Sequence, residues 1–110
     1  MATTYKVLGQ SNPSATTATT LYTVPSATSA VVSTITICNQ AGSAATFRIA
    51  VRPAGATLAA EHYIVYGATV AASDTTTLTL GLTLATTDVI TVYASSANLS
   101  FNAFGSEITA

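Results

Sequence analysis

The residues that could do chemistry in this chain are few: one histidine, one cysteine, four carboxylates and many hydroxyls. His62, together with serines and aspartates elsewhere, formally allows the Ser–His–Asp arrangement of a small hydrolase. No Gly-x-Ser-x-Gly sequence precedes a helix, and with eleven serines one must fall near any histidine. We therefore interpret His62 as a strand-end residue of the surface or of an interface, and we predict no catalytic residues and no enzyme.

The same residues do not form a metal or cofactor motif. A metal centre needs three or four ligands, and one histidine with scattered carboxylates supplies them only across a symmetry axis. Cys38 has no partner for an intrachain disulfide, and its place in a strongly β segment favours a small buried side chain. Asp74 and Asp88 fall in turns, where an aspartate can bond to backbone N–H groups. We predict no metal and no cofactor.

Composition excludes several partners. The chain has 110 residues, of which 49% are apolar and only 6% charged, with a net charge of −1. This length predicts one domain. Lys6, Arg48 and Arg52 are too few to neutralise a phosphate backbone, so nucleic acid is not an expected partner. Apolar runs fall short of the roughly 18 residues that cross a bilayer, and residues 1–6 lack signal-peptide features. We expect a soluble protein without membrane contact, made and assembled in a reducing cytoplasm.

The hydrophobic pattern from residue 21 onward is that of β-strands. Residues 77–84 place leucine at every even position and threonine or glycine at every odd one, which predicts one buried and one exposed face. Short connections favour antiparallel neighbours. We predict an all-β antiparallel sandwich, jelly-roll or immunoglobulin-like, of seven to eight strands. Helix is expected only as a turn near 56–61, and the expected strands are 21–24, 30–39, 47–52, 62–66, 77–84, 89–94 and 99–104 with a continuation to 108.

The first twenty residues have a different composition. They are rich in threonine, alanine and serine and offer little to bury. We predict an N-terminal arm over residues 1–20 and a sandwich domain over residues 21–110. A short strand at residues 5–8 is expected to join a sheet edge or to reach a neighbouring subunit.

The neutral surface indicates self-association, because few charges of either sign oppose it. In residues 47–52, period two places Phe47, Ile49 and Val51 in the core and both arginines outside, where they could hold carboxylates of a partner, of Glu61 or of Glu107. The interface candidates are Tyr5, Arg48, Arg52, His62, Tyr63 and Tyr93.

Several segments resemble small virion structural proteins of tailed bacteriophages. They are residues 21–25, 31–35, 38–39, 47–55, 61–64, 79–84, 88–94 and 105–108, and the resemblance covers everything except part of the arm. It is specific to the family rather than to a place in the particle. It implies a symmetric, non-enzymatic β-sandwich subunit and carries over no catalytic motif.

The resulting expectation is a bacteriophage capsid decoration (cement) protein. Its partners would be copies of itself, as a homo-oligomer such as a trimer, and virion proteins such as the major capsid protein. The arm would order on binding and clamp adjacent subunits. The alternatives are a tail, collar or fibre component contacting a host surface or glycan, and a carbohydrate-binding module in which Tyr63, Tyr66 and Tyr93 replace the missing tryptophan.

Overall fold

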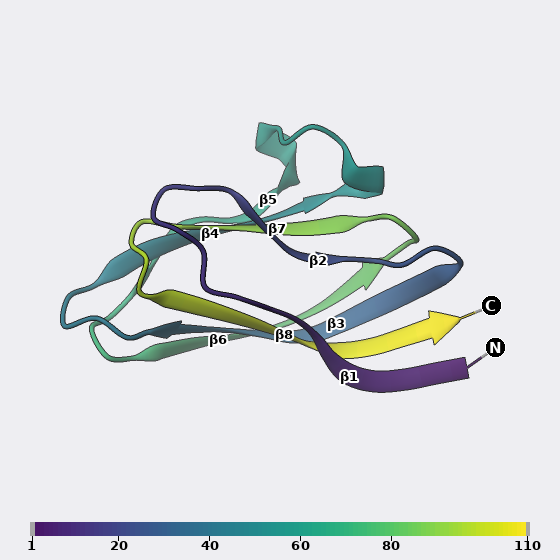
Figure 1. Ribbon diagram of the computed structural model, residues 1–110, viewed down its shortest axis with the longest axis horizontal. Coiled ribbons are helices and arrows are strands. Elements are labelled where there is room, and N and C mark those ends of the chain that lie inside the picture. The colour runs from purple at the N-terminus through teal and green to yellow at the C-terminus, as the bar shows by residue number, and fades with distance from the viewer. Residues whose placement is uncertain (1, 110) are drawn as a thin grey trace.

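The computed structural model describes residues 2–109, which form eight β-strands and two 3-10 turns (Figure 1). The turns, Pro53–Gly55 and Ala60–His62, lie in the connection between β4 and β5. Neither turn in this part of the chain has the length or the apolar character to span a membrane. The strands are β1 (Ala2–Ser11), β2 (Thr19–Thr23), β3 (Thr28–Asn39), β4 (Ala45–Arg52), β5 (Tyr63–Val70), β6 (Thr75–Leu84), β7 (Val89–Ala94) and β8 (Leu99–Thr109).

The strands form two four-stranded antiparallel sheets with the orders β1-β8-β3-β6 and β2-β7-β4-β5. Their pairing is nested, since β1 pairs with β8, β2 with β7, β3 with β6, and β4 with β5. Contacts of β3 with β8 and of β4 with β7 complete the sheets. An eight-stranded double sheet with this order is a jelly roll. The predicted all-β sandwich is confirmed, and the strand order is that of the jelly roll rather than of the immunoglobulin fold.

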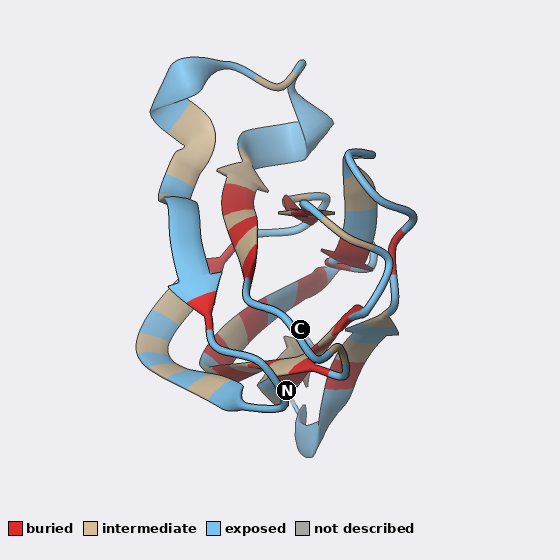
Figure 2. Cartoon of the chain, turned by 90° about the vertical axis from the view of Figure 1, so that its left-hand side faces the viewer, coloured by how far each residue is buried: buried red, intermediate tan, exposed pale blue. Residues whose placement is uncertain are grey.

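The core lies between the two sheets and receives apolar side chains from every strand. Buried and more exposed residues alternate along the strands, as Figure 2 shows. Phe47 of β4 and Phe101 of β8 meet edge to face across the sandwich, with ring centroids 6.1 Å apart. One polar side chain is fully enclosed: the Asn39 amide donates to the carbonyls of Ser43 and Val70 and accepts the N–H of Ala41. Its hydrogen-bonding groups are therefore satisfied inside the fold.

The predicted strands are present, and residues 89–94 coincide with β7. In β6 the leucines from Leu78 to Leu84 pack against the core while the intervening threonines are exposed. In β4, Phe47 and Ile49 are buried and both arginines lie outside the core, so the predicted register is correct. The helical turn expected near 56–61 is limited to Ala60–His62.

The N-terminal segment differs from the predicted arm. Residues 2–11 form the edge strand β1, which pairs with β8 along its whole length and contributes Leu8 to the core. Pro13 is also buried, and residues 12–18 connect the two sheets. The strand expected at residues 5–8 is thus present at a sheet edge, and it is longer than expected because its pairing with β8 extends from Ala2 to Ser11. These residues belong to the sandwich rather than to a separate arm, and Met1 lies outside the described residues.

Candidate functional site

The outer face of the sheet β2-β7-β4-β5 carries a row of side chains from three adjacent strands. Tyr66 of β5, Arg48 of β4 and Tyr93 of β7 are direct neighbours in the strand register. The guanidinium carbon of Arg48 lies 4.3 Å from the centre of the Tyr66 ring and 4.2 Å from that of the Tyr93 ring. At these distances the ring quadrupoles attract the cation. Arg48 is therefore held by both tyrosines.

Tyr63 joins this row because β5 is irregular. In a regular strand, residues three apart face opposite sides of the sheet. Ile64 and Gly67 have no partner in β4 and form β-bulges, and the bulge at Ile64 brings Tyr63 and Tyr66 to the same face. Their rings pack edge to face with centroids 5.0 Å apart. Gly67 has a φ of 78°, a conformation that favours glycine. We call Arg48, Tyr63, Tyr66 and Tyr93 the Tyr–Arg face.

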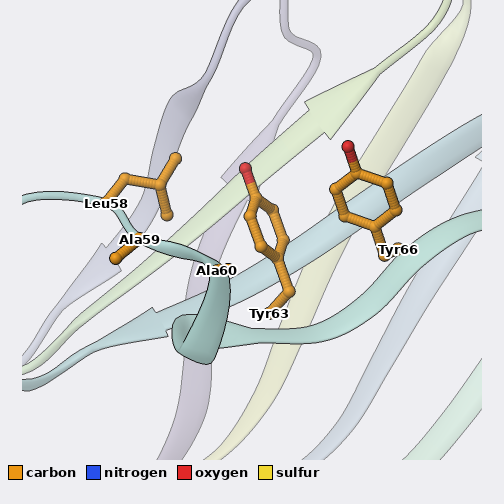
Figure 3. A pocket seen from close by; sticks show the side chains of 5 residues that line it. All are labelled: Leu58, Ala59, Ala60, Tyr63 and Tyr66. Atoms are coloured by element: carbon orange, nitrogen blue, oxygen red, sulfur yellow. The ribbon is translucent and has the colours of Figure 1, made fainter.

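An open hollow of about 590 Å³ adjoins the Tyr–Arg face. It is lined by Leu58, Ala59, Ala60, Tyr63 and Tyr66. In Figure 3, Tyr63 stands between Leu58 and Tyr66, and the two tyrosine hydroxyls point the same way. Tyr66 as a residue is 66% exposed, although Arg48 lies over one face of its ring. The hollow thus combines apolar walls with two hydroxyl groups.

The segment that forms one wall of the hollow is fixed by three polar side chains. The Nε of Arg52 donates to the Thr91 hydroxyl at 3.0 Å, and its Nη1 donates to the Ala56 carbonyl at 2.9 Å. The Asp88 carboxylate accepts the Ala54 N–H at 2.9 Å, and His62 Nδ1 accepts the Ala59 N–H at 3.0 Å. Arg52 and His62 therefore position this wall of the hollow.

The outer face of the other sheet is apolar at its β1 edge. Tyr5 is 85% exposed, Val7 47% and Phe104, opposite Val7 on β8, 36%. With Val31 and Ser33 of β3 and Ser106 of β8, these side chains border a shallow depression of about 550 Å³. We call Tyr5, Val7 and Phe104 the β1–β8 face.

A cluster of three polar side chains, Tyr22, Glu107 and Lys6, links the two sheets near this edge. Tyr22 of β2 donates its hydroxyl proton to the Glu107 carboxylate at 2.6 Å, and Lys6 Nζ lies 3.2 Å from the same carboxylate. The Tyr22 hydrogen bond, followed by Lys6, holds the pKa of Glu107 below its ordinary value against the opposing effect of burial. Burial and the bond to Glu107 raise the pKa of the Tyr22 phenol. Tyr22 therefore stays protonated and keeps donating.

Neither arginine meets a carboxylate. Within residues 2–109 the structure has one ion pair, Lys6 with Glu107. The expectation that Arg48 or Arg52 holds Glu61 or Glu107 is thus wrong for contacts within the chain, because tyrosine rings and backbone carbonyls take these places. Cys38 is half-buried rather than enclosed, since it faces away from the core between Ile37 and Asn39.

The structure brings together three of the six interface candidates. Arg48, Tyr63 and Tyr93 share one face, Arg52 and His62 hold the loop beside it, and Tyr5 lies on the opposite sheet. Tyr66, Leu58, Val7 and Phe104 are the surface residues that the interface prediction omitted. An alternating pattern in residues 5–8 would have placed Val7 beside Tyr5, whereas nothing local placed Leu58.

No group of three or more potential metal ligands occurs among the described residues 2–109. No protein-family model, curated protein or solved structure matches the chain. The geometry of the two outer faces is thus the basis for a functional proposal.

Proposed function

We propose that this chain is a structural subunit of a tailed-bacteriophage particle, namely a capsid decoration protein that binds the particle as a symmetric homo-oligomer. The major capsid protein would be its second partner. The resemblance of its sequence to small virion proteins supports this role. The jelly roll supports it too, because viral capsid domains use this fold. Since one fold serves many functions, the surface must carry the proposal.

The observation that carries it is the β1–β8 face. Tyr5, Val7 and Phe104 form an apolar strip in which Tyr5 is largely exposed and the other two side chains are partly exposed in the single chain. Covering apolar surface is favourable by roughly 25 cal/mol per Å². Among the described residues 2–109, the one ion pair, Lys6 with Glu107, is internally neutralised and puts no net charge next to the strip. A second copy of the chain presents the same neutral strip and fits this surface best.

The backbone of β1 supports the same interface. Proteins protect sheet edges with short strands, bulges and outward charges. β2 is only five residues long, β5 contains two bulges, and β6 is irregular near Gly81. β1 instead keeps a continuous register from Ala2 to Val7, and its one charged side chain turns to Glu107. β1 is therefore the edge with the least protection against pairing with another copy.

The role in the particle is tested on gradient-purified virions of the phage that encodes the chain. Quantitative mass spectrometry should find many copies of the chain per particle, and gold-labelled antibodies should decorate the heads in electron micrographs. Absence from purified particles would refute the proposal. Labels confined to the tail, collar or fibres would refute the capsid placement and favour the alternative virion location.

The interface is tested separately by sedimentation analysis of the purified chain. Replacing Val7 with Lys should shift the oligomer to single chains, because it places a charge in each copy of the strip. The matched control is Tyr66→Lys, which adds the same charge to an exposed site on the opposite sheet and should leave the mass unchanged. An unmodified chain that sediments as a monomer at high concentration would contradict self-association through β1.

A further inference from the structure

We propose that the Tyr–Arg face and its hollow bind a carbohydrate that carries a carboxylate group. The inference concerns the sheet opposite to the β1–β8 face and does not depend on the role in the particle. The three features that carry it are an arginine with unused donors, the exposed Tyr66 ring with Tyr63 beside it, and a preformed hollow of suitable size.

Arg48 has hydrogen-bonding capacity that the chain itself does not use. Within residues 2–109 its guanidinium contacts the rings of Tyr66 and Tyr93 and takes part in no ion pair. No buried side-chain nitrogen or oxygen of this part of the chain lacks a partner, so the Arg48 donors reach solvent. A guanidinium packed against two aromatic rings keeps its N–H groups at the edge of its plane. These donors match the two oxygens of a carboxylate.

The tyrosines suit a sugar ring. The negative face of an aromatic ring attracts the weakly positive C–H groups that line one side of a pyranose. Tyr66 offers an accessible ring beside Arg48, and Tyr63, packed nearly at a right angle to it, supplies a wall of the hollow. Both hydroxyls can donate to or accept from sugar hydroxyls. A volume of about 590 Å³ lies within the range of small-molecule sites.

Charge distinguishes this ligand from other anions. Arg52, the other cation of this sheet, donates from Nε to Thr91 and from Nη1 to the backbone of the loop, which fixes its guanidinium away from the rings of the Tyr–Arg face. The Arg48 guanidinium between its two rings offers the single charge and the paired donors that one carboxylate needs, whereas a phosphate carries up to two charges. A nucleic acid strand would need many more cations than the chain has. An acidic sugar combines the single charge with a ring that can stack.

The experiment screens the full chain on an array of neutral, sulfated and carboxylated oligosaccharides, followed by calorimetry with trigalacturonate and with its methyl ester. The methyl ester has the same rings without the charges. We expect carboxylated glycans to bind and the esterified or neutral ones to bind at least about tenfold more weakly, since one charge-assisted hydrogen bond accounts for that factor. Binding confined to sulfated or neutral glycans, or to none, would overturn the proposal.

Variants then locate the site. Tyr66→Ala and Arg48→Gln should each weaken binding about tenfold or more, and Arg48→Lys should do so while keeping the charge, because lysine lacks the planar fork. The matched control is Tyr5→Ala, which removes a tyrosine of similar exposure from the opposite sheet and should leave binding unchanged. Thermal melting verifies that each variant is folded. Full binding by a folded Tyr66→Ala chain would contradict the site.

Discussion

The two outer faces of this sandwich differ in how their large side chains are packed. On the sheet β2-β7-β4-β5, the large side chains pack on one another: Arg48 contacts two rings, and Tyr63 contacts Tyr66. On the sheet β1-β8-β3-β6, Tyr5 is largely exposed and Val7 is about half exposed. The first face is organised within the single chain and is suited to a small ligand, whereas the second gains most from a second protein surface.

The difference originates in the backbone. The bulges at Ile64 and Gly67 turn two tyrosines to one side and give β5 an irregular edge. The N-terminal half of β1 is regular, so its side chains alternate and its edge stays straight. The bulges of β5 thus build a site on one sheet, whereas the regular pairing of β1 from Ala2 to Val7 leaves a straight edge of the other sheet open for association.

The largest effect on the free energy of unfolding is expected at Gly105, where the backbones of β8 and β3 approach each other closely. A Cβ added at Gly105 would collide with the Val31 carbonyl and crowd the backbone of Val32. We expect Gly105→Ala to lower the free energy of unfolding by about 3 kcal/mol or more, because no flexible side chain can move aside. Urea unfolding measures this loss.

The control for that prediction is Gly42→Ala. Gly42 lies in a loop, and a Cβ there meets nothing within 4 Å, so the free energy of unfolding should change little. Equal stability of the Gly105→Ala and Gly42→Ala chains would show that the backbone approach between β3 and β8 does not set the stability of this sheet.

The second-largest effect on stability concerns the contacts that the Glu107 carboxylate makes with Tyr22 and Lys6. Glu107→Gln should lower the free energy of unfolding at neutral pH by about 1–2 kcal/mol, because it removes the charge from two hydrogen bonds. The pKa of Glu107 is lowered in the folded chain. Its contribution is therefore present above the unfolded value near 4.5 and is lost as the pH falls through the folded pKa.

Unfolding curves of both chains between neutral and acidic pH check this. The difference between unmodified chain and Glu107→Gln should be largest at neutral pH and should shrink in acid. A difference that stays constant with pH would mean that Glu107 contributes by packing alone.

A smaller effect is expected on the Tyr–Arg face. Arg48→Gln should lower the free energy of unfolding by about 1 kcal/mol, in the range of a partly exposed cation–π contact. A double-mutant cycle with Tyr66→Leu isolates the pairwise contribution. Additive losses would show that Arg48 and Tyr66 lie close together without stabilising each other.

The smallest effect on folding is expected on the β1–β8 face. Tyr5→Ser should change the free energy of unfolding of the monomer by less than about 0.5 kcal/mol, because an exposed side chain without packing partners contributes little. Measurements on the Val7→Lys background keep the chain monomeric. A loss as large as that of Arg48→Gln would remove the contrast between the two faces.

Much of the fold could be predicted from the sequence. The alternation of leucine and threonine in β6, and of apolar residues and arginines in β4, follows from the two-residue period of a strand that covers a core. The placement of Arg48 and Arg52 outside the core followed from the same rule. The nested order of the strands did not, because local patterns do not say which distant strands pair.

The contacts of the candidate site were less predictable. The spacing of Tyr63 and Tyr66 places them on opposite sides of a regular strand, and only Gly67 hinted at an irregular backbone. The carboxylate partners expected for the arginines depended on charge alone, whereas the observed contacts depend on the neighbouring strands. In the N-terminal segment the sequence predicted only a short strand at residues 5–8, since the pairing with β8 that extends it over residues 2–11 leaves no local signal.

The pairing of β1 with β8 also limits when β1 can fold during synthesis of the chain. Lys6 and Glu107 are 101 positions apart, so during translation the first strand leaves the ribosome long before its partner exists. Until the last strand is synthesised, β1 has no intramolecular mate, and pairings across such large separations form slowly. Nascent chains crowded on one messenger RNA would therefore expose the same segment that the finished protein offers to its copies.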